Sequence, residues 1–149
     1  MTESRPSFLL VDGNNIIHAW PELLRMHRER HGSAHPELIA RLTAYQDFSG
    51  DRVVVVFDGK GSTTEEVREK GAIQIFYTSA SKTADDVIEQ LAIQYASRFD
   101  ITVATNDRAE QDMVVGAGGH AISAEGLLEK LERSEKSMRD WLERNRKRS

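Results

Sequence analysis

Short apolar runs recur along the chain, and helical patterns lie between them. Four runs cover residues 8–12 (FLLVD), 52–58 (RVVVVFD), 72–78 (AIQIFYT) and 101–105 (ITVAT), and residues 121–123 begin a shorter fifth. The second run contains four consecutive valines, which do not alternate with polar residues. Such a run is typical of a strand that is covered on both faces, as in a parallel sheet.

Between the runs, apolar residues recur with the period of a helix. The clearest pattern covers residues 83–99, where Val87, Leu91 and Tyr95 fall on one stripe at the helical period of about 3.6 residues. Further helices are expected over residues 36–48 and 107–115, and helical structure is expected from residue 127 to the end. Strands that alternate with helices predict an α/β fold with a mainly parallel central sheet.

The composition is that of one globular domain. The chain has 149 residues, of which 39% are hydrophobic, and we expect residues 1–149 to form a single domain. The sequence has no cysteine, which excludes a disulfide scaffold, a thiolate zinc site and a cysteine nucleophile. No apolar run approaches the roughly 18 residues that span a membrane, and the N-terminus does not resemble a signal peptide. We therefore expect a cytoplasmic protein with no membrane contact.

The charge is mildly acidic and unevenly distributed. The net charge of −4 argues against a purely electrostatic nucleic-acid binder, but not against an enzyme whose carboxylates hold metal ions. The C-terminal segment differs, because residues 139–149 contain five basic residues and two acidic ones. We expect a basic helix or tail from about residue 133 to residue 149.

Acidic residues follow the ends of the predicted strands. Asp12 and Asp58 end the first two runs, Asp85 and Asp86 open the helix after the third, and Asp107 follows the fourth. Because ligands bind at the carboxyl ends of the strands in an open parallel sheet, we expect these acids to meet there. At about 4 Å, two like charges near a protein surface repel by about 4 kcal/mol. A bound divalent cation would offset this repulsion. Because the ligands are all oxygen atoms, they indicate Mg²⁺ or Mn²⁺.

Structural roles compete with this interpretation. Thr83 and Asp86 match a capping box, in which both would serve the start of the helix. Asp107 and Glu110 have the same spacing, so they also match a capping box. Asp58 and Asp12 each precede a glycine, and Asp-Gly is a common turn. The two roles can also divide, with Asp86 as the cap while the adjacent acid faces the site.

Amide and basic side chains accompany the acids. Asn14 and Asn15 follow the first strand, where one is expected to cap a helix and the other to hold a metal ligand or a phosphate. Lys60, Lys82 and Arg108 lie next to the acids along the chain, as expected of a basic rim that binds a phosphate backbone.

Three histidines are spaced four residues apart. His27, His31 and His35 would share one face of a continuous helix and could bind zinc there. Gly32 and Pro36 interrupt such a helix. We therefore expect a solvated surface segment rather than a zinc site.

Five segments resemble one known family. They are LLVDGNNIIHAWPEL, LIARLTAYQ, RVVVVFDG, TADDVIEQLA and VATNDRAEQ. Together they resemble the YacP-like branch of the NYN ribonuclease domains, which are relatives of the PIN nucleases. The resemblance covers about residues 7–125, which is most of the chain.

The resemblance implies a PIN-like three-layer α/β/α sandwich and a metal-dependent endoribonuclease. It implies that Asp12, Asn15, Asp85 and Asp107 form the catalytic site, and that Asp86 shares the metal with the three catalytic aspartates. Some relatives act on messenger RNA associated with ribosomes, which makes RNA and the ribosome the expected partners.

The sequence thus predicts an endoribonuclease that uses one or two Mg²⁺ or Mn²⁺ ions and leaves 5′-phosphate and 3′-hydroxyl ends. Asn14 and Asp58 would hold the metal ligands in position without binding the metal themselves. One alternative is an RNA-binding module with the same fold and weak catalysis. Another alternative is a small-molecule phosphatase with an aspartyl nucleophile at Asp12. It is less favoured, because Asn14 stands where such enzymes usually have a second aspartate.

Overall fold

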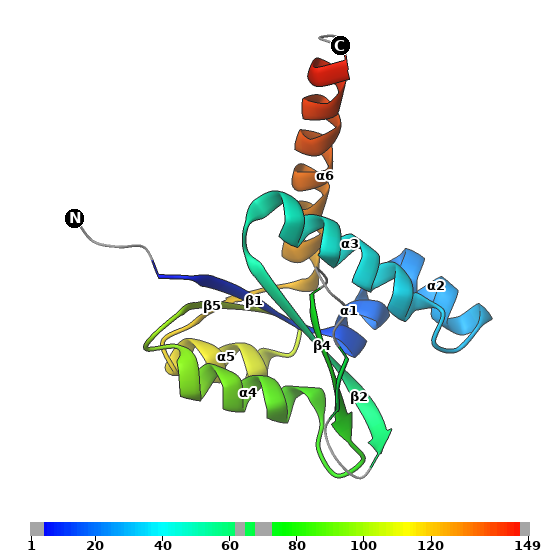
Figure 1. The fold of residues 1–149 in the computed structure, drawn as a ribbon. Coiled ribbons are helices and arrows are strands. Elements are labelled where there is room, and N and C mark those ends of the chain that lie inside the picture. The colour runs from blue at the N-terminus through cyan, green and yellow to red at the C-terminus, as the bar shows by residue number, and fades with distance from the viewer. Residues whose placement is uncertain (1–4, 62–64, 68–72, 147–149) are drawn as a thin grey trace.

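A six-stranded sheet forms the centre of the molecule (Figure 1). The computed structural model describes residues 5–61, 65–67 and 73–146, without the side chain of Lys60. The strand order is β3-β4-β2-β1-β5-β6, and only the β3–β4 pair is antiparallel. The strands are β1 (Ser7–Asp12), β2 (Arg52–Gly61), β3 (Glu65–Val67), β4 (Gln74–Ser79), β5 (Asp100–Ala104) and β6 (His120–Ile122).

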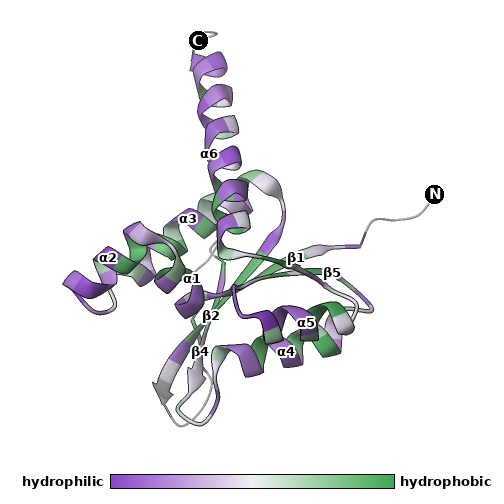
Figure 2. Ribbon diagram, turned by 180° about the vertical axis from the view of Figure 1, so that it is seen from behind, coloured by the Kyte–Doolittle hydropathy of each residue, from purple (hydrophilic) through white to green (hydrophobic). Residues whose placement is uncertain are grey.

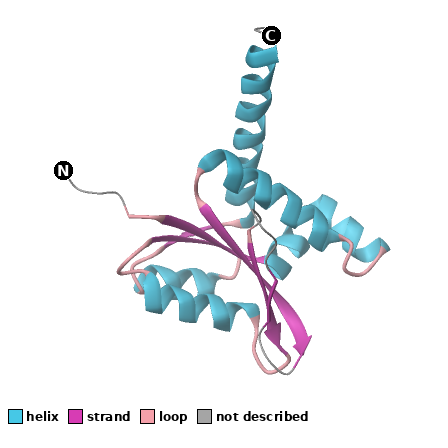
Figure 3. Ribbon diagram, viewed as in Figure 1, coloured by secondary structure: helices cyan, strands magenta, loops and turns pink. Residues whose placement is uncertain are grey.

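Helices cover both faces of this sheet (Figure 3). One face carries α1 (Gly13–Ala19), α2 (Pro21–Glu29), α3 (Ala34–Ser49) and the first part of α6 (Ala124–Arg146). The other face carries α4 (Ala84–Tyr95) and α5 (Arg108–Gly116). The predicted α/β/α sandwich with a mainly parallel sheet is therefore confirmed.

Alternation along β1 divides the core into two layers. Leu9 and Val11 pack with the α1–α3 and α6 side, whereas Leu10 packs with α4 and α5. Successive side chains of a strand point to opposite faces, so an unbroken apolar run supplies both layers at once. Figure 2 shows the result, with hydrophobic residues along the sheet and on the helix sides that face it.

The structure adds two elements that the pattern does not predict and shortens one that it does. Helix α2 is only nine residues long and buries only Leu23 fully, and all three residues of β3 are exposed. Helix α4 ends at Tyr95 rather than at residue 99, because residues 96–98 form a turn before β5.

The distal part of α6 extends away from the rest of the molecule (Figure 1). Ala124, Leu127 and Leu131 are buried, whereas Trp141 and Leu142 are 51% and 52% exposed. Residues 133–146 of the predicted basic segment belong to this helix, and residues 147–149 lie outside the described residues. None of the helices that the structure describes is long and apolar enough to cross a membrane.

Candidate active site

Asp12 lies at the centre of the carboxyl edge of the sheet. It is the last residue of β1 and the N-cap of α1, and it is only 6% exposed. A side chain at Gly13 would collide with the Phe57 ring, so glycine lets α1 start directly against β2. Burial raises the pKa of Asp12 to about 6, and the negative charges of Asp85 and Asp58 act in the same direction.

Three carboxylates converge beside Asp12. Asp85, Asp107 and Glu110 each offer one oxygen, and these oxygens lie within 4.8 Å of one another. Asp85 belongs to the first turn of α4, Asp107 is the N-cap of α5, and Glu110 is in the first turn of α5. The structure thus brings together Asp85 and Asp107, as expected of acids that follow neighbouring strand ends.

Glu110 is the member of this group that the sequence interpretation did not place in the site. Its side chain is 1% exposed, and its Oε2 accepts a hydrogen bond from Thr105 Oγ1 at 3.0 Å. Burial, the negative charge of Asp12 and a side-chain hydrogen bond between the two carboxyl groups together raise its pKa to about 9. A bound cation would oppose this effect, because it favours the ionised form of both acids.

The expected capping box at Asp107 and Glu110 forms only in half. Asp107 Oδ1 accepts a hydrogen bond from the Glu110 backbone N–H at 3.1 Å. The Asp107 N–H donates to Thr105 Oγ1 at 3.1 Å instead of to Glu110. The Glu110 carboxylate is consequently available to the site.

Adjacent acids on α4 have different partners. Asp86 Oδ2 accepts from the Thr83 N–H at 3.2 Å and Thr83 Oγ1 accepts from the Asp86 N–H at 3.3 Å, so this capping box is complete. The group of converging oxygens includes Asp85 and not Asp86. The structure therefore places Asp85 in the site and Asp86 at the helix cap.

Asp58 and Asn14 hold the start of α4. Asp58 Oδ1 accepts a hydrogen bond from the Ala84 N–H at 2.8 Å, and Asn14 Oδ1 accepts one from the Asp58 N–H at 3.3 Å. These bonds connect the end of β2 to the first turn of α4, which carries Asp85. Both side chains are thus placed to position a ligand rather than to be one.

Asn15 has a comparable position on the other side of Asp12. Its Oδ1 accepts from the Asn106 N–H at 2.9 Å, and Asn106 Oδ1 in turn accepts from the Ala124 N–H at 2.8 Å. Trp20 Nε1 donates to the Ala124 carbonyl at 2.8 Å. This chain of hydrogen bonds ties α1 and the start of α6 to the loop that carries Asp107.

The negative charges of the acidic residues also affect Glu89 on α4, and two exposed basic residues lie near the acids along the chain. The pKa of Glu89 is raised by burial and by the charges of Asp85, Asp86 and Asp107. Lys82 precedes α4 and Arg108 opens α5, and both side chains are exposed. The side chain of Lys60, the third predicted basic contact, lies outside the described residues.

The donor set fits a hard divalent cation. Asp85, Asp107 and Glu110 supply only oxygen ligands, which Mg²⁺ and Mn²⁺ prefer. Oxygens on opposite sides of a bound Mg²⁺ lie about 4.2 Å apart, twice the Mg–O distance of about 2.1 Å. The three oxygens lie within 4.8 Å of one another, which is close to this value and so compatible with ligands of one ion.

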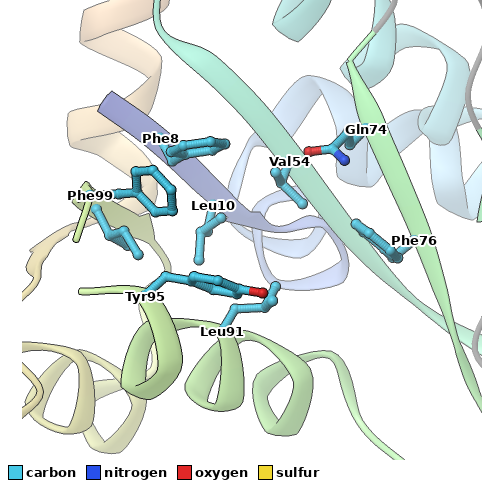
Figure 4. Close-up of a pocket in the computed structure, with 9 residues that line it drawn as sticks. Phe8, Leu10, Val54, Gln74, Phe76, Leu91, Tyr95 and Phe99 are labelled. Atoms are coloured by element: carbon cyan, nitrogen blue, oxygen red, sulfur yellow. The ribbon is translucent and has the colours of Figure 1, made fainter. Parts of the chain in front are cut away.

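A separate apolar pocket lies away from these acids. It has a volume of about 270 Å³ and lies between the sheet and the C-terminal part of α4, where Phe8, Tyr95 and Phe99 line it (Figure 4). No carboxylate lines it, whereas Asp85 lies in the first turn of the same helix. This pocket is therefore not part of the candidate site.

A mainly parallel sheet with carboxylates converging at its carboxyl edge is compatible with a nuclease, and the family comparison points to the same class. The chain belongs to the family of YacP-like NYN domains, whose model matches residues 9–149. Membership of this family implies a nuclease-like function related to RNA, and NYN nucleases typically depend on divalent metal ions.

Individual relatives come from Bacillus subtilis. The chain is 36% identical to the uncharacterized protein YacP of strain 168 over 132 aligned residues. The aligned region covers 86% of this chain and 76% of that protein. The crystal structure of Rae1 (YacP) matches with a TM-score of 0.77 and 34% identity, over 93% of this chain and 80% of that one. Its W164L mutant matches with a TM-score of 0.78 and 33% identity, over 93% and 82% of the two chains.

Proposed function

We propose that the protein is a metal-dependent endoribonuclease that hydrolyses phosphodiester bonds of RNA. The observation that carries the proposal is the convergence of Asp85, Asp107 and Glu110 beside the buried Asp12, in a chain of the NYN family. Hydrolysis would leave 5′-phosphate and 3′-hydroxyl ends. The proposal includes a single domain over residues 1–149 and a cytoplasmic location.

Asp85, Asp107 and Glu110 would hold the first Mg²⁺ or Mn²⁺ ion. When bound, such an ion activates water and stabilises negative charge on the scissile phosphate. Asp12 is not within the group of converging oxygens, but it lies near enough for the Asp85 charge to raise its pKa. Its proposed role is to complete the ligand set of this ion or of a second one.

The surrounding side chains would position the ligands and the substrate. Asp58 and Asn14 fix the start of α4, and Asn15 fixes the loop before α5. Lys82 and Arg108 would bind phosphates on either side of the scissile bond, with Lys60 as a third contact. Ribosome-associated messenger RNA as the substrate is an expectation from the family resemblance alone.

The test is incubation of purified protein with single-stranded and structured RNA in Mg²⁺, Mn²⁺ or EDTA, followed by mapping of the product ends. We expect internal cleavage with either ion, 5′-phosphate ends, and no cleavage in EDTA. Undiminished cleavage in EDTA would contradict the metal mechanism. Binding without cleavage would favour the RNA-binding module, and release of phosphate from small monoesters would favour the phosphatase.

A further inference from the structure

The ring of His27 contacts the rings of two other histidines on the helical layer that contains α1 and α2. The centroid of His27 lies 5.2 Å from that of His18 and 4.5 Å from that of His31. His18 is in α1, His27 is in α2, and His31 follows the end of α2 at Glu29. The chain reverses there through Gly32, whose φ of 85° suits glycine. The helix break expected from the sequence is present, yet it gathers the rings instead of dispersing them.

The environment of His27 favours a neutral imidazole with an available nitrogen. Burial lowers the pKa of His27, and the positive charges of His31 and His18 lower it further. His27 Nδ1 is buried with no hydrogen-bond partner among the described residues. A buried ring nitrogen without a partner is an unfavourable arrangement unless another group binds to it.

The hydrogen bond of His18 fixes which of its nitrogens can bind an ion. His18 Nδ1 lies 2.8 Å from the Asn14 carbonyl oxygen, and because a carbonyl only accepts, Nδ1 is the donor. In the neutral ring, Nε2 then carries the free lone pair. This is the usual arrangement of a metal-bound histidine, in which the second nitrogen donates to a carbonyl or a carboxylate.

The ring separations agree with a shared metal ion. With a Zn–N distance of about 2.0–2.1 Å, two imidazoles on one tetrahedral ion have centroids about 5 Å apart. The observed separations of 5.2 and 4.5 Å bracket this value. The nitrogens of the three histidines do not all lie within 4.8 Å of one another as the rings stand, because among the described residues only the acidic group meets that distance. His18 and His31 are exposed, so their rings can turn to direct their nitrogens toward one ion.

We propose that His18, His27 and His31 form a binding site for a transition-metal ion of the Zn²⁺ class, separate from the acidic site. Imidazole nitrogens suit Zn²⁺, Ni²⁺ and Cu²⁺, whereas the carboxylates at the sheet edge suit Mg²⁺ and Mn²⁺. The ion would tie α1 to the end of α2, with its fourth position open to solvent. His35 is not a ligand, because its ring stacks on Phe57 with centroids 4.1 Å apart and planes 11° apart.

The test is titration of untagged, EDTA-treated protein with Zn²⁺ by calorimetry, and with Co²⁺ by visible absorption. Both are performed in an Asp85→Asn background, which disables the acidic site. We expect binding of one ion and the intense visible bands of tetrahedral Co²⁺. Zn²⁺ binding that is present in the wild-type protein but lost in Asp85→Asn would overturn the proposal, because the ion would then belong to the acidic site.

Single substitutions locate the ligands. His18→Gln, His27→Gln and His31→Gln should each weaken Zn²⁺ binding by more than the roughly 10- to 100-fold that loss of a supporting partner costs. The matched control is His120→Gln, an exposed histidine on β6 that pairs with Asp100 at 3.5 Å, and it should bind Zn²⁺ as before. His18 and His31 are exposed, so their variants should keep the fold, which circular dichroism checks. Equal binding by the control and all three ligand variants would overturn the proposal.

Discussion

Two clusters of titratable side chains lie in different parts of this molecule, and they were assembled in different ways. The acidic cluster draws Asp85, Asp107 and Glu110 from two helices, and Asp12 lies beside it at the end of β1. The histidine cluster comes from one short stretch, residues 18–31, that doubles back on itself. The first depends on the topology of the sheet, and the second on a single turn and the rotamers of its rings.

The clusters also differ in how burial affects the charge of their neighbouring side chains. Burial lowers the pKa of His27, which favours its neutral form beside the other two rings. Carboxyl groups in water are ionised at neutral pH, but burial raises the pKa of Asp12 to about 6 and that of Glu110 to about 9. The fold therefore keeps buried acids whose ionisation it disfavours. The ionised acidic cluster therefore costs stability, and the cation of the proposed function would offset that cost.

The largest expected effect comes from the adjacent acids of α4. Asp85→Asn should lower RNA cleavage by orders of magnitude while it leaves the metal-free melting temperature unchanged or raised, because a repelling charge is removed. Asp86→Asn is the matched control. It should retain activity and lose about 0.3–1 kcal/mol of stability, because only a charge at the helix N-terminus is removed. The measurements are one cleavage assay and melting curves without metal.

A destabilised but fully active Asp85→Asn protein would remove Asp85 from the site. It would also remove the main distinction between the acidic cluster and an ordinary helix cap, because Asp85 and Asp86 would then have the same role.

Metal addition separates the two clusters by their ions. Mg²⁺ or Mn²⁺ at about 100 times its dissociation constant should stabilise the wild-type protein by about 2.7 kcal/mol, since the ion binds only the folded state. The stabilisation should shrink in Asp85→Asn and persist in His27→Gln. Thermal denaturation with and without each ion measures both. A stabilisation that His27→Gln abolishes and Asp85→Asn retains would reverse the assignment of ions to clusters.

Glu110→Gln tests the cost of the buried acid. Because the folded state raises the pKa of Glu110 from 4.5 to about 9, its contribution to stability is complete below pH 4.5 and is lost as the pH rises toward 9. A pKa difference of one between the folded and unfolded states corresponds to about 1.4 kcal/mol. The metal-free variant should therefore be more stable than wild type at pH 8 and less dependent on pH. Urea denaturation at pH 5 and pH 8 measures this, with the exposed Glu129→Gln as the control.

The outcome that contradicts this prediction is an unchanged or steeper pH dependence in Glu110→Gln. Asp12 would still contribute in the variant, between its ordinary pKa of 3.8 and about 6, so some dependence below pH 6 is expected to remain.

The convergence of Asp85 and Asp107 could be predicted because it follows from topology. Unbroken apolar runs separated by helices indicate a parallel sheet, and the ends of parallel strands share one edge. Glu110 could not be found in this way, because its spacing from Asp107 is that of a capping box. Only the burial of its side chain against Thr105 distinguishes a site residue from a cap.

The elements and contacts that escaped prediction are those set by tertiary packing. Helix α2 has nine residues and buries one of them fully, and β3 has three residues, all exposed. The histidine contacts depend on the angle at which the chain turns after Arg30, which the spacing of His27 and His31 does not specify. The bonds from Asn14 and Asn15 reach residues far along the chain, and an amide next to a strand end does not reveal its partner.

A smaller effect is expected from Asn15→Ala. The loop that carries Asp107 would lose the acceptor of the Asn106 N–H, at a cost of about 0.5–1.5 kcal/mol for one hydrogen bond. Cleavage should fall by less than in Asp85→Asn, because the acids themselves remain. Asn145→Ala is the control, since the hydrogen bond that the structure describes for its side chain lies within α6, to the Trp141 carbonyl oxygen. Equal losses of cleavage in Asn15→Ala and Asp85→Asn would make Asn15 a direct participant in the chemistry.

The smallest effect is expected at the end of α6, where charges are dispersed along a solvated helix instead of clustered. Deletion of residues 145–149 removes Arg146, Lys147 and Arg148, the last two of which lie outside the described residues. If these cations bind phosphates of RNA or of an RNA-rich partner such as the ribosome, affinity should fall and the salt slope should shrink by about 0.7 for each phosphate that the variant no longer binds. Titration of RNA and of ribosomes at several salt concentrations measures both. Cleavage of a short RNA should be unchanged, because the acids are intact. If affinity and slope also stay unchanged, the cations serve only the C-terminal dipole of α6, and RNA recognition rests on the sheet edge.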